Sequence, residues 1–248
     1  MKKTFSIFLA FLFSISAFSQ EVFQNWEYWN TWTYKPKAEM VQKFEAAAAK
    51  KTKIFNSERD NMILTFKVVT GKNTGAYLRI QPWQQSKDYD KDKSKELKYW
   101  NDNVSEYADA LGGQKRWARM PWGDVNTGEK PSNHLTQHSY IIKPGKLQDF
   151  RRWQERLGKI SSERRPEHVR VILGMISGGN WQEFVVFRGF DKYQSTPIES
   201  DKTWEQDYNK RFGVNTWAND REKFAESIEM LLGHQVQTLE LVESMMPN

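Results

Sequence analysis

The sequence contains one pattern twice, and this repeat constrains the fold more than any other feature. Residues 70–83, TGKNTGAYLRIQPW, return 107 positions later as residues 177–190, SGGNWQEFVVFRGF. Gly71 and Asn73 align without a gap with Gly178 and Asn180. Each copy predicts a strand, a tight turn and a second strand, because Gly and Asn tolerate the positive φ angles of such turns.

The elements around each hairpin repeat as well. The first half predicts strands at 26–34, 61–70, 75–83 and 115–120, with one helix opening at Pro36 and another ending at Gly112. The second half predicts strands at 134–143, 168–176, 181–190 and 235–242, helices over 147–160 and 217–228, and an inserted helical piece at 204–212. Because Lys35-Pro36 and Lys143-Pro144 lie 108 apart, we align the first strands of the two halves at that offset. We therefore expect two β-α-β-β-α-β units, residues 20–121 and 134–248, joined by a Gly-, Pro- and Asn-rich linker at 122–133.

Two such α+β units in tandem resemble the ferredoxin-like arrangement. More narrowly, they resemble the dimeric α/β-barrel superfamily, which includes antibiotic-biosynthesis-type monooxygenases, haem-degrading monooxygenases and chlorite-dismutase-like proteins. The resemblance covers residues 25–245 and rests on element order and the repeat. It implies that the two antiparallel sheets pack as an intramolecular α/β barrel around a cavity. The pattern also allows two ferredoxin-like domains that pack in some other way.

The first 19 residues have the features of a secretory signal peptide. Lys2 and Lys3 precede an apolar run, and Ala17 and Ser19 stand before the expected cleavage at Gln20. We therefore expect an exported protein, periplasmic or secreted, with no integral membrane segment after cleavage; an N-terminal membrane anchor is the other interpretation. Removal of the two lysines lowers the net charge from +6 to +4, and the remaining basic residues are scattered, which argues against nucleic-acid binding.

Alternation along the strands predicts which side chains face the cavity. Leu64, Phe66, Leu78 and Ile80, with their counterparts in the second half, are uniformly apolar, so we expect them under the helices. The alternate positions carry aromatic and polar side chains that are typical of a ligand site. The predicted ligand-binding residues are Asn30, Trp32, Tyr77, Arg79, His138, Tyr140 and Arg188. Since a buried guanidinium needs a counter-charge, we expect an anionic group near Arg79 or Arg188, with Glu240 as one protein partner to consider.

No catalytic motif identifies a reaction, and the four histidines have no metal-site spacing, so catalytic residues stay unassigned and no metal is expected. The first hypothesis is a protein that binds a small apolar or aromatic ligand, anionic if the arginines contact it, between its two sheets. The alternative, which the superfamily resemblance implies, is a monooxygenase-type enzyme, either cofactor-free or haem-dependent. No cofactor is expected in the first case; His138 or His168 would be the axial ligand of a haem. A carbohydrate-binding module that uses exposed Trp is a third interpretation, and the oligomeric state is not predicted.

Overall fold

The computed structural model describes residues 26–126, 131–194 and 202–247. The predicted signal peptide lies outside these residues. The strands are β1 (Tyr28–Pro36), β2 (Leu64–Val68), β3 (Tyr77–Gln84), β4 (Ala108–Ala110), β5 (Lys115–Arg119), β6 (His134–Ile141), β7 (Arg170–Ser177), β8 (Glu183–Phe190) and β9 (His234–Leu241). The α-helices are α2 (Val41–Phe55), α3 (Ser94–Asn103), α4 (Leu147–Arg164), α5 (Trp204–Phe212) and α6 (Thr216–Ser227). Short 3₁₀ helices are η1 (Arg59–Asn61), η2 (Ser86–Tyr89), η3 (Ser105–Tyr107) and η4 (Glu243–Met245).

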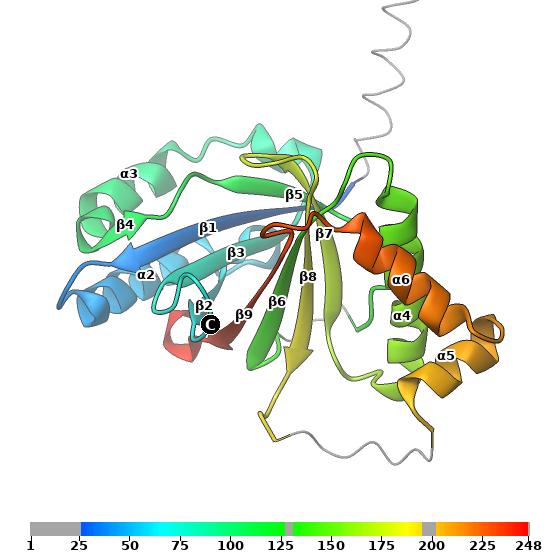
Figure 1. Ribbon diagram of the computed structural model, residues 1–248. Helices are drawn as coiled ribbons and strands as arrows, with labels where there is room; N and C mark the ends of the chain where they lie inside the picture. The colour runs from blue at the N-terminus through cyan, green and yellow to red at the C-terminus, as the bar shows by residue number, and fades with distance from the viewer. Residues whose placement is uncertain (1–25, 127–130, 195–201, 248) are drawn as a thin grey trace, which may run out of the picture.

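Eight of the strands form a closed antiparallel barrel (Figure 1). Their order is β3-β2-β9-β6-β8-β7-β5-β1, and β1 pairs with β3 to close the ring. Within each half the strands lie in the order fourth, first, third, second, which is β5-β1-β3-β2 and then β9-β6-β8-β7. The halves are joined by β2–β9 on one side and β5–β7 on the other. One chain therefore supplies both sheets of the barrel, as expected.

The two hairpins share one register. Leu64 pairs with Ile80 in the first, and Val171 pairs with Phe187 in the second, 107 positions later on both strands. The predicted offset of 108 for the first strands is wrong by one pleat. Trp32 lies opposite Arg79, whereas the residue opposite Val186 is His138, which is 106 positions after Trp32.

The helices that follow these strands confirm the offset of 106, since α2 begins at Val41 and α4 at Leu147. Pro36 lies five residues before the start of α2, whereas Pro144 lies only three residues before the start of α4. The matching Lys-Pro pairs are therefore not structurally equivalent.

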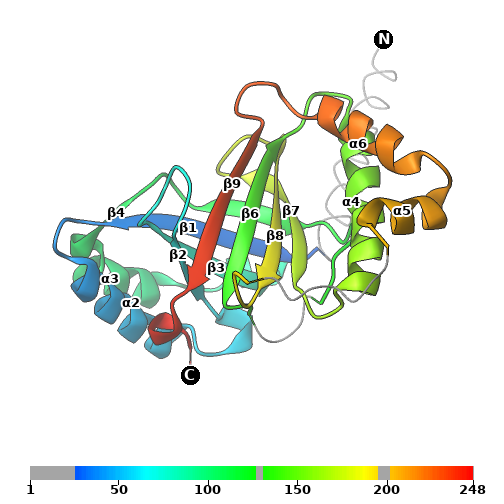
Figure 2. The same cartoon turned by 60° about the horizontal axis from the view of Figure 1, so that its bottom comes forward.

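The helices cover the outside of the barrel in two separate layers (Figure 2). Helices α2 and α3 lie over the first half, and α4, α5 and α6 over the second. Helix α3 ends at Asn103, earlier than predicted, and is followed by η3 and by β4, which pairs with the far end of β1. The segment expected to be a linker pairs with the barrel through Val125 and Arg170. Among the described helices none is both long enough and apolar enough to cross a membrane.

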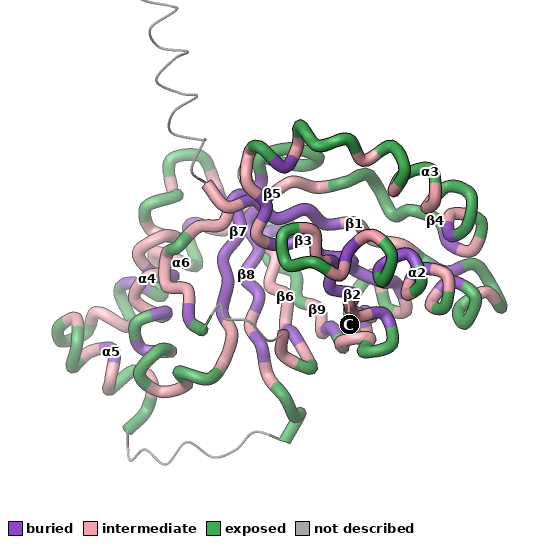
Figure 3. The backbone as a smooth tube through the Cα atoms, turned by 180° about the vertical axis from the view of Figure 1, so that it is seen from behind, coloured by how far each residue is buried: buried purple, intermediate pink, exposed green. Residues whose placement is uncertain are grey.

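The barrel interior is an apolar core, which reverses the predicted assignment of the strand faces. Buried positions follow the strands (Figure 3), and one cluster joins Leu64, Phe66, Leu78 and Ile80 with Val171, Leu173, Val185 and Phe187 inside the barrel. The residues predicted to face a cavity between the sheets lie instead beneath the helices. Alternation separates the two faces of a strand but does not say which face is enclosed. A ring of strands excludes water on all sides, so the uniformly apolar face belongs there.

Candidate functional site

Six of the seven predicted site residues separate into two pockets on the outer face of the barrel. Asn30, Trp32 and Arg79 line a pocket under α2 and α3, which we call the first pocket. The second pocket, under α4, α5 and α6, is lined by His138, Tyr140 and Arg188. Tyr77 lines neither pocket.

Tyr77 is part of the packing between sheet and helix. It is buried against Phe44 of α2, and its hydroxyl donates a hydrogen bond to Glu45. Burial and this carboxylate together raise the pKa of Tyr77 above the ordinary tyrosine value. Tyr77 therefore lies outside both pockets, and its contact with a ligand stays a prediction.

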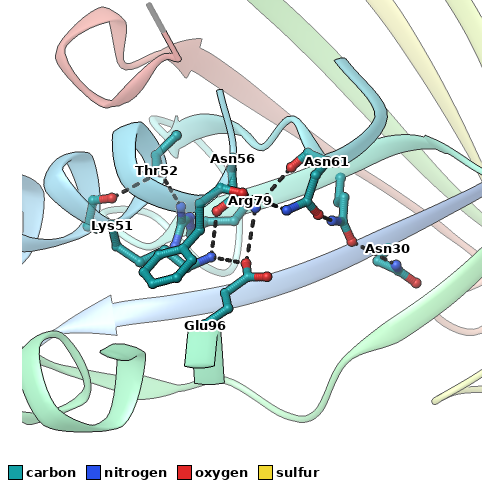
Figure 4. Close-up of polar contacts among 10 residues, drawn as sticks. Asn30, Lys51, Thr52, Asn56, Asn61, Arg79 and Glu96 are labelled. Carbon is teal, nitrogen blue, oxygen red and sulfur yellow. Dashed lines mark hydrogen bonds and ion pairs between the residues drawn. The ribbon is translucent and has the colours of Figure 1, made fainter. Parts of the chain in front are cut away.

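The first pocket has a volume of about 440 Å³ and lies between the sheet and two helices. Strands β1, β3 and β5 supply its floor, because alternation turns Trp32, Arg79 and Arg116 outward from the barrel. Helix α2 contributes Lys51, and α3 contributes residues on its inner face, Glu96, Leu97 and Trp100. Figure 4 shows the polar side chains that meet beside this floor.

Arg79 is the most deeply buried charge of the first pocket, with 2% of its surface exposed. Its Nη2 donates a hydrogen bond to Thr52 Oγ1 at 2.5 Å, and its guanidinium carbon lies 5.1 Å from the centre of the Trp100 ring. Its Nε has no acceptor, and it forms no ion pair with any described carboxylate. Burial lowers the pKa of Arg79 to about 10, so the group is still a cation at neutral pH. The pocket therefore holds a desolvated positive charge without a protein counter-ion in contact.

Lys51 lies beside this charge and is held by two side-chain acceptors. Its Nζ forms an ion pair with Glu96 and donates a hydrogen bond to Asn56 Oδ1 at 2.6 Å (Figure 4). Burial, together with the nearby Arg79 cation, lowers the pKa of Lys51 to about 8. Burial alone would raise the pKa of Glu96, but Lys51 and Asn56 lower it below its ordinary value. Near neutral pH, Lys51 can therefore give up its proton far more readily than a surface lysine.

A chain of amides continues the polar floor beyond Arg79. Asn30 Nδ2 donates to Gln81 Oε1 at 3.0 Å, and Gln81 Nε2 donates to Asn61 Oδ1 at 2.6 Å. Tyr89 from η2 donates to Asn30 Oδ1 at 3.0 Å, and the Arg116 guanidinium carbon lies 3.5 Å from the centre of the Tyr89 ring. These contacts fix the orientation of the floor residues before any ligand arrives.

The sequence analysis missed Lys51, Glu96 and Trp100 as site residues. One signal for Lys51 is visible in the sequence, because it ends an otherwise apolar helical stripe that contains Phe44 and Ala48. A charged residue on the buried face of a helix is rarely accidental. Glu96 gives no such signal, since it stands in a run of charged residues whose spacing resembles an ordinary solvated helix.

The second pocket has a volume of about 520 Å³ and combines histidines, arginines and aromatic rings. His138 Nδ1 lies 3.1 Å from His234 Nε2, and the His234 ring stacks on Tyr140 with 4.5 Å between ring centres. Burial, followed by the Arg188 charge, lowers the pKa of His138 to about 3, so this imidazole is neutral at physiological pH. Arg188 makes no ion pair with Glu240, which we had considered as its partner.

The donor types decide which pocket could hold a cofactor. Within the described ranges, no group of three metal-ligating side chains comes together. The residues that line the first pocket include no histidine, cysteine or methionine, whereas His138, His168 and His234 all line the second. By donor type the second pocket could hold a haem: His138 or His168 would bind its iron, and the arginines would face its carboxylates. The first pocket offers a substrate cavity without the usual axial ligands.

No protein-family model and no curated protein matches the sequence. Solved structures do match the fold. A candidate monooxygenase from Lactobacillus acidophilus shares 11% identity with a TM-score of 0.53, over 87% of this chain and 94% of that chain. A candidate monooxygenase from Fusobacterium nucleatum shares 10% identity with a TM-score of 0.52, over 88% and 93%. A candidate chlorite dismutase shares 9% identity with a TM-score of 0.53, over 89% and 96%.

At such low identities the likeness concerns the fold and not the residues of the pockets. The matches extend over nearly the whole length of each solved chain, so they include both halves of the barrel. This protein therefore has the fold of the dimeric α/β-barrel superfamily, with both sheets of the barrel supplied by one chain.

Proposed function

We propose that the first pocket binds a small aromatic molecule that carries an anionic group. The observation that carries this proposal is Arg79, a buried cation at the pocket floor with no carboxylate in contact and an unpaired Nε. A desolvated charge of this kind is costly unless an opposite charge reaches it. An anionic ligand would supply that charge whenever the pocket is filled. The proposed site lies under the helices, not between the sheets as the sequence suggested.

The rest of the first pocket suits the same ligand. Its charged lining residues are four cations, Lys51, Arg79, Lys93 and Arg116, and one carboxylate, Glu96. Trp32 and Trp100 provide indole surfaces on which an aromatic ring can stack. The excess of cations favours binding of an anion, and the indole surfaces favour binding of a planar ring.

The test compares an aromatic acid with its neutral amide. We expect 2-naphthoate to shift the NMR signal of the labelled Lys51 amine, which lines this pocket, saturably, and 2-naphthamide to bind there at least about tenfold more weakly, because a charge-assisted contact contributes roughly 1.5–3 kcal/mol. In Arg79→Met the preference for the acid should disappear, and in Arg79→Lys it should return in part. Arg221→Met, an exposed arginine on α6, is the matched control. If Arg79→Met keeps both its fold and its preference for the acid, the proposal is wrong.

A second candidate function, oxygenation of the bound aromatic, is favoured by the position of Lys51 beside Arg79. Solved structures with this fold include candidate monooxygenases, which agrees with an enzyme of that type. A lysine whose pKa is about 8 can remove an acidic proton from the substrate, and the neighbouring guanidinium can stabilise the anion that forms. The anion then transfers electrons to O₂, so that a CH₂ group and one O₂ become a carbonyl and one water. No redox cofactor is required for this balance.

Oxygen consumption distinguishes the enzyme from a binding protein. With an aromatic substrate that has an acidic ring CH₂ group, we expect one O₂ per carbonyl formed, and a loss of at least about 100-fold in Lys51→Met, as is typical when a general base is removed. Binding without O₂ uptake by the unaltered protein would leave only the binding function.

A haem-dependent enzyme is the remaining version of this candidate. Bound haem would supply redox-active iron, and the second pocket would hold it through His138 or His168 as the ligand on the metal. Arg188 would then lie near the propionates. Titration with haemin tests this version, since a Soret shift that is lost in one of the two variants His138→Ala and His168→Ala would support it.

We also propose that the chain arose as a tandem duplication of a ferredoxin-like unit and that residues 1–19 direct its export. The shared hairpin register supports the first proposal, and the charged start and apolar run of the sequence support the second. N-terminal sequencing of the mature protein from its native host should begin at Gln20. A mature protein that still begins at Met1 would exclude cleavage.

A further inference from the structure

The second pocket contains an arrangement of charge that ligand binding in the first pocket does not use. Arg170 and Arg188 lie directly opposite each other on β7 and β8, on the face covered by α4, α5 and α6. Side chains at directly opposite positions of antiparallel strands have Cβ atoms only about 4.5–5.5 Å apart, and like charges there destabilise the sheet. Arg170 is buried and Arg188 is partly exposed, so water screens part of this repulsion and a bound anion would offset the rest.

The protein supplies that compensation to only one of the two. Arg170 donates hydrogen bonds to the Gly123 carbonyl and, at 2.5 Å, to Gln154 Oε1. The more distant Asp124 carboxylate also interacts favourably with its positive charge. Asp124 itself is bound to Arg119 at 2.7 Å. Arg188, which is partly exposed, has no hydrogen bond and no ion pair with any described residue, and its Nε is buried without an acceptor among them. No acidic residue is among those that line the second pocket in the described part of the chain.

The neighbouring groups do not neutralise Arg188. His138 and His234 are held neutral and contact each other, so neither adds a negative charge. Tyr140 is buried, which raises the pKa of its hydroxyl and keeps it protonated. The opposite wall of the pocket is aromatic and is formed by Trp153, Trp204, Trp217 and Phe224. An anion with an attached ring matches both walls.

The first half lacks this arrangement, although its hairpin has the same register. At the offset of 107, Arg170 and Arg188 correspond to Ile63 and Gln81, an uncharged pair in the first pocket. The arginine pair is thus a feature of the second half alone and not a requirement of the fold. We expect this pair to lower the stability of the ligand-free protein, as functional residues commonly do.

We infer that the second pocket is a separate binding site for an aromatic carboxylate, whose carboxylate lies at Arg188 beside Arg170 and whose ring lies on the aromatic wall. The two pockets share no lining residue, so this inference does not depend on the function proposed for the first. Haem carries carboxylates of the same kind on a larger ring. The experiment therefore tests a small aromatic acid and haemin separately, since both carry a carboxylate attached to an aromatic ring system.

Histidine side chains provide a local readout. Of the four histidines in the sequence, three line the second pocket and none lines the first. In protein labelled with ¹⁵N-histidine, 2-naphthoate should shift the imidazole signals of His138 and His234 saturably, and 2-naphthamide should bind at least tenfold more weakly. Haemin forms the second arm and is followed by its Soret band. Arg79→Met, which alters only the first pocket, should leave both arms unchanged.

The Arg188→Met variant separates a ligand site from a structural role. We expect Arg188→Met to weaken naphthoate or haemin binding at least tenfold and Arg188→Lys to recover part of that loss. The Tm of ligand-free Arg188→Met should equal or exceed that of the unaltered protein. A lower Tm would show that Arg188 serves the fold, and this result would overturn the inference. Unchanged affinity in Arg188→Met, or absence of binding in both arms, would overturn it as well.

Discussion

The lowered pKa of Lys51 follows from its burial beside the Arg79 cation, which its ion pair with Glu96 only partly offsets. Its pKa in the folded protein is about 8, against about 10.4 in an unfolded chain. Between these two values the unfolded state binds more protons than the native state, so the contribution of Lys51 to the free energy of unfolding rises as the pH increases. Below pH 8 that contribution is unfavourable, because the native state must keep a buried charge.

Urea unfolding from pH 7 to pH 10 tests this directly. The difference in free energy of unfolding between the unaltered protein and Lys51→Met should change in favour of the unaltered protein as the pH rises from about 8 to about 10. NMR of the labelled lysine amine should show a titration near pH 8 that is absent from Lys51→Met. A difference that stays flat across this range would contradict the assignment.

Gly158 of α4 is a residue whose size is fixed by a backbone contact. A Cβ built at this position would lie 2.1 Å from the Gly123 Cα, so no side chain fits without moving the segment that holds Arg170. We expect Gly158→Ala to lower the free energy of unfolding by about 1–3 kcal/mol, as overpacking does. Thermal melting checks this, with Gly113→Ala as control, since nothing lies within 4 Å of a Cβ at Gly113. Equal melting temperatures for the two variants would mean that the glycine contact is not tight.

At the scale of elements, the last turn of the chain is part of the packing of the first half. The 3₁₀ helix η4 follows β9 and inserts Met245, which is fully buried, beside Phe44 and Tyr77. Truncation of a buried methionine costs about 2–5 kcal/mol. Met245→Ala should therefore lower the free energy of unfolding by that amount.

Met230→Ala is the matched control, because Met230 is 90% exposed. Its effect should stay within about 0.5 kcal/mol. Chemical denaturation of both variants provides the measurement, and a Met245→Ala protein as stable as the control would show that the C-terminal turn is not docked.

The order of the elements could be predicted from the sequence because hydrophobic periodicity and turn residues are local signals. The repeated hairpin was sufficient to pair β2 with β3 and β7 with β8. The offset of the first strands was misread, since the two Lys-Pro pairs do not occupy equivalent positions before their helices and β1 has an irregular register between Tyr28 and Asn30. The short edge strand β4 has no distinctive pattern of its own.

The faces of the strands and the boundaries of the site could not be predicted in the same way. Which face is enclosed depends on closure of the barrel through the β2–β9 and β5–β7 pairs, and these are contacts between distant segments. Six of the seven predicted site residues line a pocket because aromatic and polar alternation was recognised correctly. These six residues are divided between two pockets because the helices dock on the barrel in two separate layers. The same docking brings Lys51 and Glu96 into the first pocket.

At the scale of the whole molecule, one apolar interior is shared by both halves. Phe66 from β2 and Leu173 from β7 belong to the same buried cluster. We expect Phe66→Ala to lower the stability by about 3–5 kcal/mol and to do so equally for both halves. Hydrogen exchange checks this, since the amides of Leu78 in β3 and Val185 in β8 should lose protection by the same amount.

Two independent domains would behave differently, with loss of protection confined to β3. The surface variant Arg221→Met should leave both amides unchanged. The closed ring of strands thus predicts one cooperative unit whose halves do not unfold separately.

The burial of Met245 beside α2 has a consequence for the order in which the protein can be completed. Synthesis releases the first half from the ribosome well before the last residues are made, and the wall that α2 forms with β3 then lacks its final side chain. The same holds at the far side of a membrane if the chain is threaded through it from the N-terminus. The packing between α2 and β3 beside the first pocket is therefore complete only when the C-terminal residues have been made.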